Sequence, residues 1–181
     1  MRYIGHGVTT ELVDLPRIGQ KILNCVVYLY DTPENARDGK NTGGTGFVIF
    51  VESERHRGTV YSMVVTCRHV AVEDGHSCVR INGKDGLSNY IEADPSDWIW
   101  TDISKDLAIL PISIDAEFFD VTPLHKDMLL SNEDAVELDI GVADDVMMIG
   151  RFIDQDGGVV NSPVCRFGNI SSMPVLSLIH I

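Results

Sequence analysis

Short apolar runs, separated by clusters of Gly, Asp, Asn and Pro, dominate the pattern of hydrophobic and polar positions along the chain. Runs of β-branched and aromatic residues bounded by turn residues are typical of strands, and no helical period is sustained over more than about two turns. The fold class predicted is therefore all-β. Strands are expected at 22–30, 47–51, 60–65, 79–82, 90–92, 107–112, 145–153 and 159–167.

Two pairs of these runs predict antiparallel hairpins. The first joins 47–51 to 60–65 through a charged loop, and the second joins 145–153 to 159–167 through a turn at 154–158 that contains two glycines. The turn at 154–158 also resembles a calcium loop, but it lacks the later acidic ligands that calcium needs. The polar segment 31–45 is expected to be a loop.

Composition and charge narrow the classes of partner. The 181 residues are 44% hydrophobic, which is enough to build a core, and the net charge of −13 would repel nucleic acid and anionic membranes. No apolar run is long enough for a membrane helix, and the first residues lack the core of a secretory signal. We therefore expect a cytoplasmic protein whose four cysteines are reduced and form no metal site.

Two residues stand where catalytic chemistry could be held rigidly. His69 lies just beyond the strand that ends with the apolar run 60–65 and Thr66, and Asp106 directly precedes the apolar run that begins at Leu107. A carboxylate at the mouth of a buried strand is costly unless it is paired, and an imidazole that donates to it would be fixed in one tautomer. Asp102 is a competing candidate in a more polar segment. The other five histidines lie in polar, acidic or terminal segments.

Three segments, in order, carry a family resemblance: Gly-Thr-Gly-Phe-Val-Ile at 44–49, Val-Thr-Cys-Arg-His-Val at 65–70 and Lys-Asp-Leu-Ala-Ile-Leu at 105–110. Together they resemble the trypsin-like (chymotrypsin-fold) serine peptidases, in particular the bacterial type. The resemblance implies two β-barrels with the active site between them, a peptide or protein substrate and no cofactor. It also implies that His69 takes the proton of a serine hydroxyl while Asp106 holds the imidazole.

The resemblance suggests a division of the chain. The expected parts are an N-terminal segment (1–20), a first barrel carrying His69 and Asp106 (21–115), an inter-barrel connection (116–138), the start of a second barrel (139–175) and a tail (176–181). The tail resembles the translation of a sequencing adapter, with an ordinary apolar strand as the alternative. No late serine has the flanking glycines of the family's nucleophile. We therefore expect an inactive fragment of a peptidase that lacks the serine.

Several alternatives stay open. The first is a non-catalytic binding or scaffold protein with the same fold. The second is a cysteine nucleophile beyond this segment; Cys165 itself is expected in mid-strand, which does not suit a nucleophile. The glycines at 43–46 are interpreted as a strand-initiating turn, since no helix follows to hold a phosphate. Cys67 is assigned a structural, buried role.

Overall fold

The computed structural model describes residues 19–102, 104–152 and 157–173. The predictions for most of segment 1–20, for positions 154–156 of the second turn and for the tail at 176–181 lie outside the described residues. The described strands are β1 (Val26–Tyr30), β2 (Thr42–Glu52), β3 (Val60–Thr66), β4 (Cys78–Asn82), β5 (Ser88–Ile91), β6 (Ala108–Ile112), β7 (Leu124–His125), β8 (Asp145–Gly150) and β9 (Val164–Asn169). The helical segments are η1 (Gln20–Cys25), α1 (Pro33–Asp38), η2 (His69–Glu73), η3 (Pro95–Asp97), η4 (Lys126–Met128) and α2 (Asn132–Glu137).

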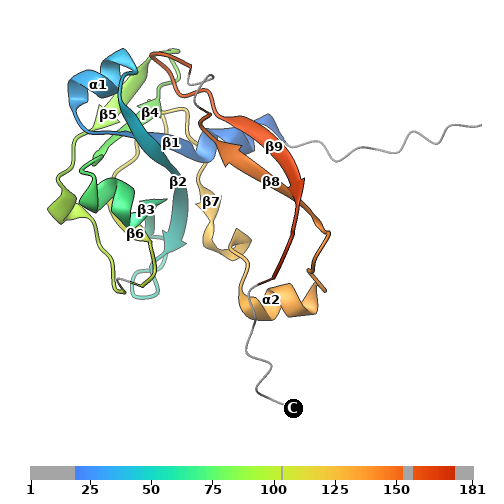
Figure 1. Cartoon of the computed structure of the whole chain (residues 1–181). Helices are drawn as coiled ribbons and strands as arrows, with labels where there is room; N and C mark the ends of the chain where they lie inside the picture. The colour runs from blue at the N-terminus through green and yellow to red at the C-terminus, as the bar shows by residue number, and fades with distance from the viewer. Residues whose placement is uncertain (1–18, 103, 153–156, 174–181) are drawn as a thin grey trace, which may run out of the picture.

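One antiparallel sheet organises the N-terminal two thirds of the chain. Its strands follow the order β5-β4-β1-β2-β3-β6 and curve into a half-barrel, while the short β7 runs parallel to β2. β8 and β9 pair only with each other and form a separate two-stranded sheet (Figure 1). The chain is mostly β with a few short helices, so the prediction of an all-β fold is confirmed in part.

The strand β1 is buried on both of its faces. Its five residues alternate between two apolar clusters, as the two-residue period of a strand requires. Val27 and Leu29 join the core inside the half-barrel, whose other strands contribute residues such as Val48, Val64 and Val79. Val26, Tyr28 and Tyr30 face the opposite side and pack with Cys25, Ala36 and Cys78. The central strand therefore needs a cover outside the half-barrel.

Arg80 lies at the centre of this outer cover. Its side chain, which projects from β4, is fully buried and lies over the Tyr28 and Tyr30 rings at 5.6 and 4.7 Å from their centroids. The guanidinium donates hydrogen bonds to Ala36 O at 2.9 Å, Gly158 O at 2.8 Å and Asn161 Oδ1 at 2.9 Å. A single cation thus joins the half-barrel, the α1 helix and the segment that leads into β9.

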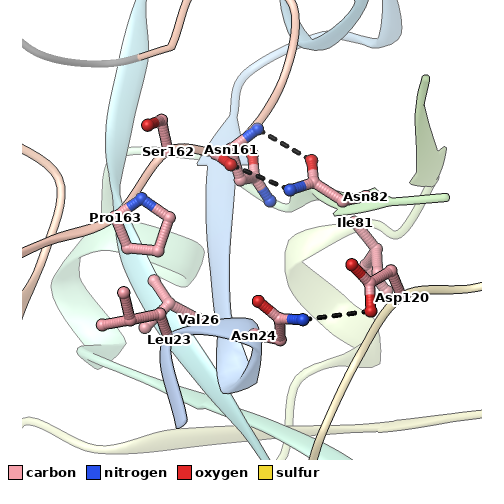
Figure 2. Close-up of a pocket in the computed structure, with 9 residues that line it drawn as sticks. All are labelled: Leu23, Asn24, Val26, Ile81, Asn82, Asp120, Asn161, Ser162 and Pro163. Carbon is pink, nitrogen blue, oxygen red and sulfur yellow. Dashed lines mark hydrogen bonds between the residues drawn. The ribbon is translucent and has the colours of Figure 1, made fainter. Parts of the chain in front are cut away.

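Asn161 completes this junction from the other side. Its Nδ2 donates to Arg80 O, its backbone N–H donates to Asn82 Oδ1, and its carbonyl accepts from Asn82 Nδ2. Figure 2 shows the Asn82–Asn161 pair at the rim of a polar pocket of about 140 Å³. Asn24 closes the far side of that pocket by donating to Asp120 at 3.0 Å. The approach to β9 is therefore held by paired amides rather than by apolar packing.

The segment 31–45, expected to be a loop, holds α1 and the first residues of β2. Thr32 caps the helix by accepting from the Asn35 N–H, Pro33 occupies the first turn, and Gly39 ends it with φ of +69°. These are the residue types that begin and end helices. Six residues are too few for hydrophobic periodicity to reveal, although the capping residues were visible in the sequence.

Other segments also differ from their predicted boundaries. In the second predicted hairpin β8 ends at Gly150 instead of 153 and β9 begins at Val164 instead of 159, so the strands are joined by a longer connection than the predicted turn at 154–158. The first strand begins four residues later than expected, because 22–25 belong to the helical segment η1. The connection at 116–138 contains β7, η4 and α2, the last of which begins with a capping box between Ser131 and Asp134. None of the helices in the described residues has the length and apolar character needed to cross a membrane.

The hairpin of β8 and β9 exposes an unusual amount of apolar surface. Met148 and Phe167 are 60% and 71% exposed, and Val146 and Met147 are also exposed. Consecutive apolar residues point to opposite faces of a strand, so both faces of β8 present apolar side chains to solvent. Exposed apolar strands of this kind are sites of association between chains.

Removing the guanidinium of Arg80 should destabilise the fold strongly. In Arg80→Met the buried acceptors at 36, 158 and 161 lose their donor, and we expect the free energy of unfolding to fall by about 3 kcal/mol. Urea denaturation measures this value. Arg37→Met is the matched control, because Arg37 is exposed, and its effect should stay within about 0.5 kcal/mol. Equal effects of the two substitutions would contradict the central role of Arg80.

The exposed hairpin predicts self-association of the 181-residue chain. Sedimentation velocity should show a weight-average mass that rises with protein concentration. Phe167→Ser should reduce this rise, since it removes the aromatic ring of β9, which is 71% exposed. Leu87→Ser is the control, because Leu87 is 63% exposed but lies in a turn away from this hairpin. A monomer at all concentrations, or an equal effect of the control, would contradict the prediction.

Candidate functional site

The end of β3, three residues before His69, is held in place by contacts with neighbouring strands. Thr66 is buried, pairs with Ala108 of β6 and donates its hydroxyl to Thr45 O at 2.9 Å. Because β3 and β6 are antiparallel, the end of one strand lies beside the start of the other. The sequence positions of His69 and Asp106, just after β3 and just before β6, are therefore brought together by the sheet itself.

The two side chains meet through two contacts. His69 Nδ1 lies 2.5 Å from Asp106 Oδ2, and the backbone N–H of His69 donates to Asp106 Oδ1 at 2.9 Å. Each carboxylate oxygen thus has its own partner. An ionised carboxylate can only accept, so Nδ1 carries the proton of the neutral ring and Nε2 is left as the basic nitrogen.

These contacts keep Asp106 ionised. The pKa of its carboxyl is lowered from the ordinary 3.8, first by the backbone N–H of His69 and then by the His69 ring. The side chains of His69 and Asp106 are 49% and 48% exposed, so solvent reaches the pair. The arrangement can accept a proton at Nε2 while the carboxylate holds the opposite edge of the ring.

The turn η2 anchors His69 to the core. Ala71 is fully buried, and its carbonyl accepts from the Ser77 hydroxyl at 2.7 Å. At the start of the turn, Arg68 forms an ion pair with Glu73 at 2.8 Å. His69 therefore lies on a short helical turn that is held by one buried methyl group and by polar contacts.

Glycines in β2 let this turn pack closely against the sheet. A Cβ at Gly44 would lie 2.9 Å from Val70 Cγ1, one at Gly46 would lie 2.7 Å from Val65 O, and one at Gly43 would overlap the His76 ring. The interpretation of 43–46 as a strand-initiating turn was wrong, because these residues lie within β2. The glycines are required by close approach rather than by chain reversal.

Asp102 does not join the pair. Asp102 Oδ1 accepts hydrogen bonds from the backbone N–H and the hydroxyl of Ser104, at 2.9 and 2.7 Å. These bonds lower the pKa of the Asp102 carboxyl. His125 lies apart from the pair: its Nδ1 accepts a hydrogen bond from the Asp127 backbone N–H at 3.3 Å and lies 3.2 Å from Asp127 Oδ2. Cys165 lies in β9 opposite Ile149, as expected for a mid-strand residue.

Cys67 is the site residue that sequence reasoning missed. It was assigned a buried structural role, but the residue is exposed and its sulfur lies within 4.8 Å of a carboxylate oxygen of Asp106. Partial desolvation of the thiol raises its pKa, and the Asp106 charge raises it further. One ligand-type atom each of Cys67, His69 and Asp106 lies within 4.8 Å of the other two. The position of Cys67 two residues before His69, beyond the end of β3, was the available signal.

The described residues place no nucleophile at the pair. Across 19–102, 104–152 and 157–173, no hydroxyl forms a hydrogen bond with the His69 ring. Ser162 lines the polar pocket beside Asn161 (Figure 2). Partial burial and the Asp106 charge raise the pKa of the Cys67 thiol, whereas a nucleophilic thiol needs a lowered pKa.

Comparisons of the chain with protein-family models, with curated proteins and with solved structures found no match. The roles of His69 and Asp106 therefore rest on the geometry and chemistry of the site.

The lowered pKa of Asp106 can be measured directly. By carbon-detected NMR we expect its carboxyl to titrate below 3.8, so the contact with His69 persists above that pH and is lost as the pH falls through the lower folded-state value. In His69→Ala the backbone N–H remains, so the midpoint should rise only part of the way. Asp134, whose pKa is lowered by Ser131, is the internal control. An ordinary midpoint for Asp106 in the unmodified chain would contradict the geometry.

Proposed function

We propose that this chain carries the general base and the orienting acid of a serine peptidase of the trypsin-like type. The observation that supports the proposal is the double contact of Asp106 with the ring and the backbone of His69. A carboxylate bonded only to an exposed ring could rotate away, whereas the backbone bond fixes one of its oxygens. The other oxygen is then directed at Nδ1. The neutral ring therefore carries its proton on Nδ1, and Nε2 is unprotonated.

The proposed reaction uses this tautomer. Nε2 of His69 accepts the proton of a serine hydroxyl as its oxygen attacks a peptide carbonyl, and the imidazolium then returns that proton to the leaving amine. Asp106 stays ionised throughout and stabilises the charge on the ring. Its lowered pKa suits this role, since a protonated acid could neither orient the neutral ring nor stabilise the charged one. No cofactor is needed for these steps.

The fold is proposed to match the two-barrel architecture of that family. Six antiparallel strands precede residue 113, a connection with little regular structure follows, and a new sheet begins with β8. In this reading the half-barrel sheet is the first barrel, and β8 with β9 begins the second. The order of His69 before Asp106, on the connected ends of β3 and β6, supports the assignment.

A second candidate is a non-catalytic binding protein with the same architecture. It is favoured by one observation: among the described residues no hydroxyl contacts His69. In that case the pair would be a structural contact, and the exposed face of β8 would be the surface that matters. The two candidates differ in whether a serine reacts in a manner that depends on His69.

Active-site labelling distinguishes the two candidates. The protein expressed from its native gene is treated with a fluorophosphonate probe and assayed with casein. For a peptidase we expect one serine to be labelled, and His69→Ala should reduce labelling and turnover by at least about 100-fold. His125→Ala is the matched control, since it removes the other exposed His–Asp pair, and it should leave both readouts unchanged.

The 181-residue chain by itself is expected to show no turnover, because its described residues place no hydroxyl at the base. Turnover by this chain that is abolished in His69→Ala would contradict that expectation. A folded native protein that is neither labelled nor active would overturn the peptidase and support the binding protein.

A further inference from the structure

Three different ligand types converge at the mouth of the half-barrel. Cys67 offers sulfur, His69 offers an imidazole nitrogen and Asp106 offers a carboxylate oxygen, with one such atom of each within 4.8 Å of the other two. All three residues are exposed, so an ion can reach them from solvent. Of these residues, only His69 and Asp106 have a part in the proposed proton transfer, which leaves the thiol without a role in it.

We propose that Cys67, His69 and Asp106 form a site for a zinc ion. Sulfur and imidazole ligands exclude calcium and magnesium, which take oxygen ligands, and a mixed set of one sulfur, one nitrogen and one oxygen suits zinc. Three protein ligands leave the fourth tetrahedral position to water, as an exposed site requires. The zinc ion bridges side chains that the sheet already holds together.

The spacing of the ligand atoms is close to what zinc needs. Bonds of about 2.0–2.3 Å in a tetrahedron separate neighbouring ligand atoms by about 3.3–3.6 Å. His69 Nδ1 and Asp106 Oδ2, now 2.5 Å apart, must open by somewhat under an ångström, and the sulfur must approach. Side chains that are about half exposed can make such changes by rotation.

The charges and protons of the binding step balance. The Cys67 thiol releases its proton to solvent and binds as a thiolate, and the Nδ1 proton of His69 moves to Nε2 through solvent, so that Nδ1 can donate its lone pair. One thiolate and one carboxylate then neutralise the two charges of the ion. The nearby Arg68 guanidinium is paired with Glu73 at 2.8 Å, which weakens its repulsion of the cation.

Zinc at this site would oppose the reaction proposed above. With Nδ1 bound to the metal and Nε2 protonated, His69 cannot accept a proton from a serine. This inhibitory consequence rests on the proposed function, but zinc binding itself does not. Binding is therefore tested on the 181-residue chain without any assay of peptidase activity.

Zinc titration in competition with a chromogenic chelator tests the site. We expect one ion to bind per chain, and Cys67→Ala and Asp106→Asn should each weaken binding by at least about 10-fold. The matched controls are Cys165→Ala, which removes a partly exposed thiol from β9, and His125→Ala, which removes the His–Asp pair that has no thiol. Both controls should bind zinc as the unmodified chain does. Co²⁺ should give a thiolate charge-transfer band that is lost in Cys67→Ala.

A second measurement needs no substitution and so does not depend on the folding of a variant. Zinc should slow alkylation of Cys67 by iodoacetamide at least about 10-fold, as followed by peptide mass spectrometry, and should leave the rate at Cys165 unchanged. Absence of zinc binding, full binding by folded Cys67→Ala, or unprotected Cys67 in saturating zinc would each overturn the proposal.

Discussion

The buried guanidinium of Arg80 is the interaction on which the assembly of this fold depends. Burying a cation is costly unless its donors are bonded, and here they bond to Ala36, Gly158 and Asn161, which belong to three separate parts of the chain. The two tyrosine rings beneath it supply apolar area and the negative faces that a cation prefers. Without this group the apolar cluster on the outer face of β1 would lose the cation that lies over its two tyrosine rings. The path to β9 would keep its Asn82–Asn161 hydrogen bonds but lose the two bonds that the guanidinium donates to it.

The candidate site depends on a different constraint, the antiparallel pairing of β3 with β6. That pairing places the residue after one strand beside the residue before the other, so His69 and Asp106 meet without any contribution from the Arg80 junction. The site and the outer cover are therefore held by separate sets of contacts. Among the described residues, the contacts between His69 and Asp106 do not involve the residues that attach β9, and the hydrogen bonds of that attachment involve neither His69 nor Asp106.

The sequence was informative where a residue's role follows from the strand next to it. The strands at 47–51, 60–65 and 107–112 could be predicted because their apolar runs are continuous, and the pairing of His69 with Asp106 followed from their places at strand ends. The helix at 33–38 was missed because six residues carry no period. Arg80 could not be foreseen, since a single arginine in a strand gives no sign that it is fully buried. Cys67 was assigned a buried role because it has no partner cysteine nearby in sequence. In the structure β3 ends at Thr66, and Cys67 is exposed in the segment that follows.

The solvent exposure of His69 and Asp106 limits how strongly the carboxylate can stabilise a charge on the imidazole. Coulombic attraction between unit charges falls steeply as the effective dielectric rises from the interior of a protein towards water, and both members of the pair are about half exposed. The two hydrogen bonds fix the tautomer of the His69 ring, because choosing a tautomer depends only on the geometry of the bonds. Stabilising an imidazolium strongly needs the exclusion of water as well, and the half-exposed pair does not provide it. The same openness would admit a metal ion, so a cover over His69 would both strengthen the proposed base and close the proposed zinc site. The two proposals, proton transfer and zinc binding, therefore compete for one geometry, and access to solvent would decide between them.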